Sequence, residues 1–130
     1  MRVAVETLEF VYLLEEVNRR KITLVSSFML EEENQRNPFS HRKVRIEDLL
    51  ELSSDYVSYS KEVEKRAKEI EQLGIMGMDA FHIACAETAK SDFFVTCDDL
   101  LVRRDKKHAK KLAVRIIGLM EFVAKEVLGL

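Results

Sequence analysis

Short apolar segments alternating with helical patterns constrain the fold of this 130-residue chain more than any other feature. Runs typical of buried strands cover Thr23–Ser27, Phe93–Thr96 and residues 114–117, and residues 55–59 form a further strand candidate. Helical patterns lie between these runs. The alternation predicts βαβ units, and therefore an α/β fold with three α/β/α layers around a central parallel sheet.

The helical patterns are defined by the spacing of their apolar residues and by capping or stop signals. The first is predicted over residues 3–19, which places the start of the chain in a helix. Asn37-Pro38 ends the second, because the residue before proline disfavours helical backbone angles. The other predicted helices cover residues 28–34, 46–52, 61–73, 78–89, 98–107 and 119–127.

The composition indicates one globular domain over residues 1–130, with neither repeat nor linker. The net charge is only −2, so binding to nucleic acid would require a local basic patch. Cys85 and Cys97 lie in apolar stretches and are predicted to be buried free thiols. The sequence shows no signal peptide and no stretch long enough to cross a bilayer, so we expect a cytoplasmic protein without membrane contact.

Acidic residues lie near the predicted carboxyl ends of the strands, where open parallel sheets bind their ligands. Asp98 follows the Phe93–Thr96 run, Glu33 lies six residues beyond Ser27, and Asp79 stands in the first turn of its helix. Carboxylates gathered at one sheet edge repel each other, and Mg²⁺ or Mn²⁺ would neutralise them. Such an ion could orient a water for attack on a phosphodiester.

Each acid also has a purely structural interpretation. Asp98 is a natural N-cap for the helix that follows it, and Asp79 could serve its own helix in the same way. Glu33 closes the run Glu31-Glu32-Glu33, and a charge run is usually a solvated face. Spacing alone leaves both interpretations open.

Two stretches of the second half resemble the PIN domain family, in which an Asp-Ala pair opens a small-residue helix and a later hydrophobic strand ends in Thr-x-Asp. The upstream run Val25-Ser26-Ser27, followed by Glu33 and Asn37-Pro38, is similar to the second strand and acidic helix of that family. The two stretches are Met78-Asp79-Ala80-Phe81-His82-Ile83-Ala84-Cys85-Ala86 and Asp92-Phe93-Phe94-Val95-Thr96-Cys97-Asp98-Asp99-Leu100-Leu101.

The resemblance implies a PIN fold and cleavage of RNA that depends on Mg²⁺ or Mn²⁺. Glu33, Asp79 and Asp98 match three of the family's four acidic positions, which are catalytic and hold the metal, and Thr96 matches the polar residue beside the last of them. The resemblance also implies an antitoxin-type protein partner and a homodimer, since many relatives are toxin ribonucleases of toxin–antitoxin pairs.

The chain departs from the family at its start. PIN domains begin with a hydrophobic strand that lies in the middle of the sheet and ends in an Asp, the first metal ligand. Here residues 1–5 are interpreted as helix, and no Asp precedes Glu33. We therefore predict an N-terminally truncated PIN-like domain with the first strand absent, through a start placed too far downstream or through loss. The Thr23–Ser27 and Phe93–Thr96 strands would then pair directly, with dimerisation, or a partner chain would fill the gap; we favour direct pairing.

A basic stretch follows Asp98. It predicts a phosphate-guiding rim beside the acidic site, with a solvated helix face as the alternative. The predicted RNA-binding residues are Arg103, Arg104, Lys106 and Lys107, and His108, Lys110, Lys111 and Arg115 continue the stretch. Tyr56 and Tyr59 could stack on bases or simply line a strand edge, and His82 is expected to pack on its helix face.

The sequence thus favours a divalent-metal-dependent ribonuclease of PIN type, possessing all but the first acid. The alternative is a catalytically inactive PIN-like module that binds RNA or protein. A third hypothesis is a folded fragment produced by a misplaced start codon.

Overall fold

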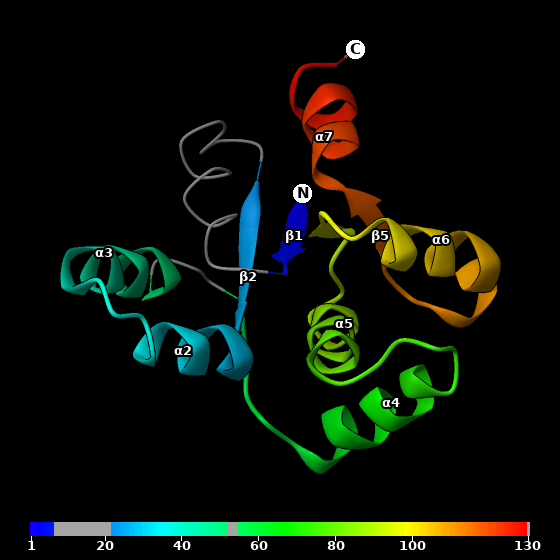
Figure 1. Ribbon diagram of the computed structural model, residues 1–130, viewed down its shortest axis with the longest axis horizontal. Coiled ribbons are helices and arrows are strands. Elements are labelled where there is room, and N and C mark those ends of the chain that lie inside the picture. Colours follow the sequence, from blue (N-terminus) through cyan, green and yellow to red (C-terminus); the bar gives the residue numbers. More distant parts are fainter. Residues whose placement is uncertain (7–21, 52–54, 130) are drawn as a thin grey trace.

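The computed structural model describes residues 1–6, 22–51 and 55–129, which fold around one parallel sheet (Figure 1). The strand order is β3-β2-β1-β4-β5 and every pairing is parallel. The strands are β1 Arg2–Val5, β2 Thr23–Ser27, β3 Asp55–Val57, β4 Phe93–Thr96 and β5 Arg115–Gly118. The predicted parallel sheet is confirmed, and so are its strands after the first.

Strand β1 corrects the prediction for the start of the chain. Arg2–Val5 is the central strand, with Val3 paired to Leu24 of β2 on one side and to Phe93 of β4 on the other. The first strand is therefore present, and the direct pairing of β2 with β4 is wrong because β1 lies between them. The helix predicted over residues 3–19 is wrong at its start, and residues 7–19 lie outside the described residues. A strand buried on both faces is apolar at successive positions and lacks the alternation that identifies a half-buried strand. The apolar residues of β1 therefore also fit the start of a helical pattern.

Alternate residues of the sheet face two separate hydrophobic cores, as three layers require. Ala4 belongs to one core, with residues of α4 and α5. Val3 and Val5 belong to the other, with Leu30 and Phe122. Val3, Ala4 and Val5 are all almost fully buried. Figure 1 accordingly shows α4 and α5 on one side of the strands and α7 on the other.

Apart from α3, the described helices agree with the predicted ones, with small shifts at their ends. They are α2 Phe28–Gln35, α3 Ser40–Glu51, α4 Lys61–Glu71, α5 Met78–Thr88, α6 Asp99–His108 and α7 Leu119–Phe122, with a 3-10 turn at Ala109–Lys111 and a π-helical end at Val123–Val127. Helix α3 begins earlier than predicted. Among the described residues, no helix is long and apolar enough to span a membrane.

An ion pair ties α4, α5 and the segment before β5 together. Arg66 Nε and Nη2 donate to the two carboxylate oxygens of Glu87, at 2.6 and 3.1 Å. Arg66 also donates to the Lys111 carbonyl at 2.6 Å, and the Ala113 amide donates to Glu87 at 2.8 Å. The Glu87 side chain is only 8% exposed, so these contacts replace its lost hydration.

Candidate functional site

The central strands β1 and β4 deliver acidic residues to the same edge of the sheet. Because they are parallel neighbours, with Val5 paired to Val95, their carboxyl ends lie side by side. Glu6 follows β1 directly, and Asp98 follows Thr96, the last residue of β4, by two positions. Helix α5, which packs on both strands, carries Asp79 in its first turn. Its N-cap is Gly77 at φ 59° and ψ −128°, a conformation that favours glycine.

Thr96 joins the two strand ends through its hydroxyl, which is fully buried. Thr96 Oγ1 donates a hydrogen bond to Glu6 Oε2 at 2.5 Å and accepts one from the Asp98 amide at 2.9 Å. The Cys97 amide also donates to Glu6 Oε2, at 3.3 Å. The Glu6 carboxylate is thus held between donors of the β4–α6 turn, and its position is fixed relative to Asp98.

Asp79 completes this group. Its pKa is raised above the ordinary value, first by burial and then by the negative charges of Glu6 and Asp98. Glu6 and Asp98 therefore both act on Asp79, and we call Glu6, Asp79 and Asp98 the acidic cluster. Asp98 also performs the predicted capping role, since it accepts a hydrogen bond from the Leu100 amide at 2.8 Å at the start of α6. The structural and functional interpretations of Asp98 are compatible.

Glu6 is the acid that sequence reasoning missed. It follows the apolar run Val3-Ala4-Val5 directly, as the acid of a first PIN strand would, but an Asp was sought and the run was interpreted as helix. Glu33, by contrast, lies on α2 and lines a cavity of about 310 Å³ with Phe39, Arg42 and others between α2 and α3. The negative neighbours that act on Asp79 are Glu6 and Asp98, not Glu33. The metal-binding role of Glu33 stays a prediction.

The chemistry of the acidic cluster suits a hard divalent cation. Its donors are carboxylate oxygens, which Mg²⁺ and Mn²⁺ prefer, and bringing such charges together favours a cation among them. Within the part of the chain that the structure describes, no group of three or more Asp, Glu, His or Cys residues is already arranged to hold a metal. Mg²⁺ is usually bound through one or two carboxylates, with water completing its shell.

The buried Cys85 thiol and His82 imidazole near the acidic cluster are not charged at neutral pH. Burial lowers the pKa of His82 to about 4 and raises the pKa of Cys85 to about 11. His82 packs beside Phe94, with ring centroids 6.3 Å apart. Cys97, however, is exposed next to the acidic cluster, so its predicted burial is wrong. It belongs to the turn after β4 and not to the strand itself.

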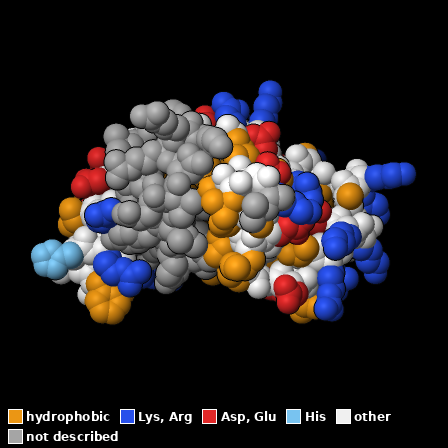
Figure 2. Space-filling model, turned by 90° about the horizontal axis from the view of Figure 1, so that it is seen from above, with side chains coloured by type: hydrophobic (Ala, Val, Ile, Leu, Met, Phe, Trp, Pro, Cys, Tyr) orange, Lys and Arg blue, Asp and Glu red, His pale blue; other side chains and the backbone are white. Residues whose placement is uncertain are grey.

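The basic stretch runs along α6 and away from the acidic cluster. Arg103, Lys106 and Lys107 are exposed. Arg104 instead lies over Gly74, where an added Cβ would come within 3.0 Å of the Arg104 Cζ atom. Figure 2 shows Lys and Arg side chains gathered at the end of the molecule that α6 occupies. The RNA-binding role of these residues stays a prediction.

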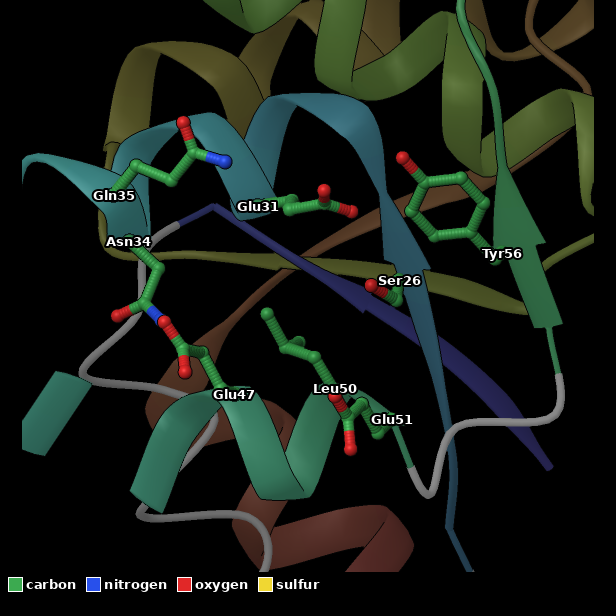
Figure 3. Close-up of a pocket in the computed structure, with 8 residues that line it drawn as sticks. All are labelled: Ser26, Glu31, Asn34, Gln35, Glu47, Leu50, Glu51 and Tyr56. Atoms are coloured by element: carbon green, nitrogen blue, oxygen red, sulfur yellow. The ribbon is translucent and has the colours of Figure 1, made fainter. Parts of the chain in front are cut away.

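A separate cavity of about 400 Å³ lies between the sheet and helices α2 and α3 (Figure 3). The Tyr56 hydroxyl points toward Glu31 in Figure 3, and the pKa of Tyr56 is raised first by burial and then by the hydrogen bond to Glu31. Tyr59 packs edge-on against Phe28 with centroids 5.6 Å apart. The cavity contains no member of the acidic cluster; its lining residues are Ser26, Glu31, Asn34, Gln35, Glu47, Leu50, Glu51 and Tyr56.

Comparisons with known proteins agree with this architecture. The sequence model of the PIN domain matches residues 5–107. The fold is similar to that of a chain in the crystal structure of VapBC2 from Rickettsia felis bound to a DNA fragment from their promoter. The TM-score is 0.53 at 15% sequence identity, and the match covers 91% of this chain and 98% of the other. No curated protein matches the sequence.

Proposed function

Because the chain belongs to the PIN domain family, we propose that it is a divalent-metal-dependent ribonuclease that hydrolyses RNA phosphodiester bonds at the acidic cluster. The observation that carries the proposal is the convergence of Glu6, Asp79 and Asp98 at the carboxyl edge of β1 and β4. Glu6 supplies the acid at the end of the first strand, where the family resemblance calls for an Asp. In this proposal Glu6 takes the place of the first acid.

We assign the following roles to the residues of the site. Glu6, Asp79 and Asp98 would hold Mg²⁺ or Mn²⁺ and keep it at the sheet edge. Thr96 positions Glu6 and the Asp98 backbone through its hydroxyl. The bound ion would supply charge neutralisation and an oriented water for attack on phosphorus. Glu33, carried over from the family pattern, would act from α2 as a further ligand.

The partners follow from the same comparison. The structural neighbour is a VapBC2 complex, which supports an antitoxin-type protein partner for this chain. We also propose a homodimer and a cytoplasmic location, in keeping with the family resemblance. RNA is the proposed substrate.

A second candidate function is a PIN-like module that binds RNA or protein without cleaving it. The observation that favours it is the lack, in the described part of the chain, of a group already arranged to hold a metal. Glu6 is also engaged by two donors of the β4–α6 turn, which would compete with a metal for its carboxylate.

Cleavage of single-stranded RNA in Mn²⁺ separates the two candidates. The parent chain should cleave, and Asp79→Asn and Glu6→Gln should each lose at least tenfold in rate, because each removes a charged ligand. Asp48→Asn, an exposed acid of α3, is the matched control and should retain full activity. A parent without activity, with RNA binding retained, would support the binding module. Activity that survives Asp79→Asn unchanged would rule out the proposed site.

A further inference from the structure

The charge of the chain is strongly segregated along the sequence. Of its 21 Lys and Arg residues, seven lie between residues 100 and 115, where Asp105 is the single acid. The rest of the chain carries 14 Lys and Arg against 22 Asp and Glu. A molecule with a net charge of −2 thus presents one strongly positive end, formed by α6 and the 3-10 turn after it.

Helix α6 sorts these charges between an inner and an outer face. Leu101 is buried, and Arg104, Asp105 and His108 are half-buried on the same side. The outer side carries only cations beyond its first turn. These are Arg103, Lys106 and Lys107, which are spaced so that they lie along one helix face, and Lys110, which follows them in the 3-10 turn; all four are exposed. We call these four residues the α6 cationic stripe.

Asp105, the acid within the basic stretch, is engaged on the inner face. Asp99 lies in the first turn of α6, and Glu121 is paired with Lys125 and Arg115. Asp105 Oδ1 accepts a hydrogen bond from the Ile116 amide of β5 at 3.0 Å, so its charge is used at the sheet edge. Arg104 lies over Gly74. No residue of the stripe lies within salt-bridge distance of a carboxylate among the described residues. The pKa of His108 is lowered first by burial and then by the positive charges of Lys107, Lys111 and Arg104.

We propose that the α6 cationic stripe binds the phosphate backbone of an RNA strand whose scissile bond lies at the acidic cluster. The proposal rests on the ribonuclease function proposed above and adds a second point of contact to it. A row of exposed, unpaired cations on one helix face suits a linear polyanion, because each neutralised phosphate releases condensed counterions. Contacts to phosphates do not read the base sequence, so the stripe would bind any RNA strand of sufficient length.

The geometry of α6 sets that length. Asp98 caps the start of the helix, and Lys107 lies nine positions further along. At about 1.5 Å per residue, the helical part of the stripe extends from roughly 8 to 14 Å beyond Asp98, and Lys110 follows it in the 3-10 turn. A stacked strand advances about 3.4 Å per nucleotide, so about four nucleotides are needed on one side of the scissile bond to reach Lys107. Short RNAs would occupy the acidic cluster without reaching the far end of the stripe.

Binding of labelled single-stranded RNA tests the proposal without relying on cleavage. The measurement uses fluorescence anisotropy with a 4-nucleotide and a 12-nucleotide RNA, in the Asp79→Asn background with chelator, over a salt series. Adding Lys107→Gln and Lys110→Gln should weaken binding of the longer RNA about 20-fold at 0.1 M salt and reduce its salt slope by about 1.4, since a single-strand contact contributes about 0.7 each. The shorter RNA should change less than threefold.

The control pair is Lys61→Gln with Lys65→Gln, two exposed lysines one turn apart on α4, and it should leave both affinities unchanged. An equal loss of RNA affinity in the control variant would overturn the proposal. An unchanged affinity of the 12-nucleotide RNA for the variant with Lys107→Gln and Lys110→Gln would also overturn it. A poly-glutamate peptide that competes as well as RNA would overturn it in favour of an acidic protein partner. Failure of the parent to cleave RNA in Mn²⁺ would refute the nuclease function while leaving this binding test intact.

Discussion

The hydroxyl of Thr96 provides the sharpest test of how the acidic cluster is built. Thr96→Val keeps the shape of the side chain and removes both of its hydrogen bonds, to the Glu6 carboxylate and from the Asp98 amide. The contact with the charged partner contributes about 1.5 kcal/mol and the contact with the neutral amide about 1 kcal/mol. The added methyl group recovers part of this loss, so the free energy of unfolding should fall by about 2 kcal/mol. Thr96→Ser, which keeps the hydroxyl, should cost about 1 kcal/mol.

A double-mutant cycle isolates the link between Thr96 and Glu6. Urea unfolding of Thr96→Val, Glu6→Ala and the double variant should give a coupling free energy of about 1 kcal/mol or more, since the two side chains share a hydrogen bond. Repulsion between Glu6 and the other acids cancels in the cycle. Additivity within about 0.3 kcal/mol would refute the reasoning, because it would mean that Thr96 does not hold the Glu6 carboxylate.

Two further predictions concern stability. Glu87→Gln should lower the free energy of unfolding by about 2 to 3 kcal/mol in urea unfolding, because it leaves Arg66 without its buried partner charge; a change below about 0.5 kcal/mol would contradict this role. The pKa of His82 is lowered to about 4 in the fold, against about 6.5 in the unfolded chain. The unfolded chain therefore binds the extra proton between these values, and stability should fall by about 1.4 kcal/mol per unit as pH drops through this window, reaching about 3 kcal/mol. The difference in pH dependence between the parent and His82→Leu measures this contribution, and identical profiles would contradict it.

Much of the fold followed from local patterns in the sequence. The runs at β2 and β4 are apolar and β-branched or aromatic, which identifies buried strands, and the predicted helix over residues 61–73 corresponds to α4 at Lys61–Glu71. The structure has Asp79 in the first turn of α5 and Asp98 directly before α6, the positions predicted for them in the chain. These features depend on neighbouring residues only, so one sequence is enough to find them.

The first strand and its acid were missed for a physical reason. A central strand of four residues is buried on both faces, so Val3, Ala4 and Val5 show no alternation that distinguishes strand from helix. The identity of β1 is decided by its neighbours β2 and β4, which come much later in the chain. The same holds for Glu6, whose partners Thr96 and Cys97 are about 90 positions away. Contacts at such separations are set by the sheet order.

The central claim is that Glu6, Asp79 and Asp98 form one cation-binding site. A calorimetric titration with Mn²⁺ of the parent chain, Glu6→Gln and the exposed control Glu62→Gln tests it most directly. The parent and the control should bind Mn²⁺ alike, and Glu6→Gln should bind at least tenfold more weakly because one carboxylate of the site has lost its charge. Equal Mn²⁺ affinity for the parent and Glu6→Gln would contradict the account.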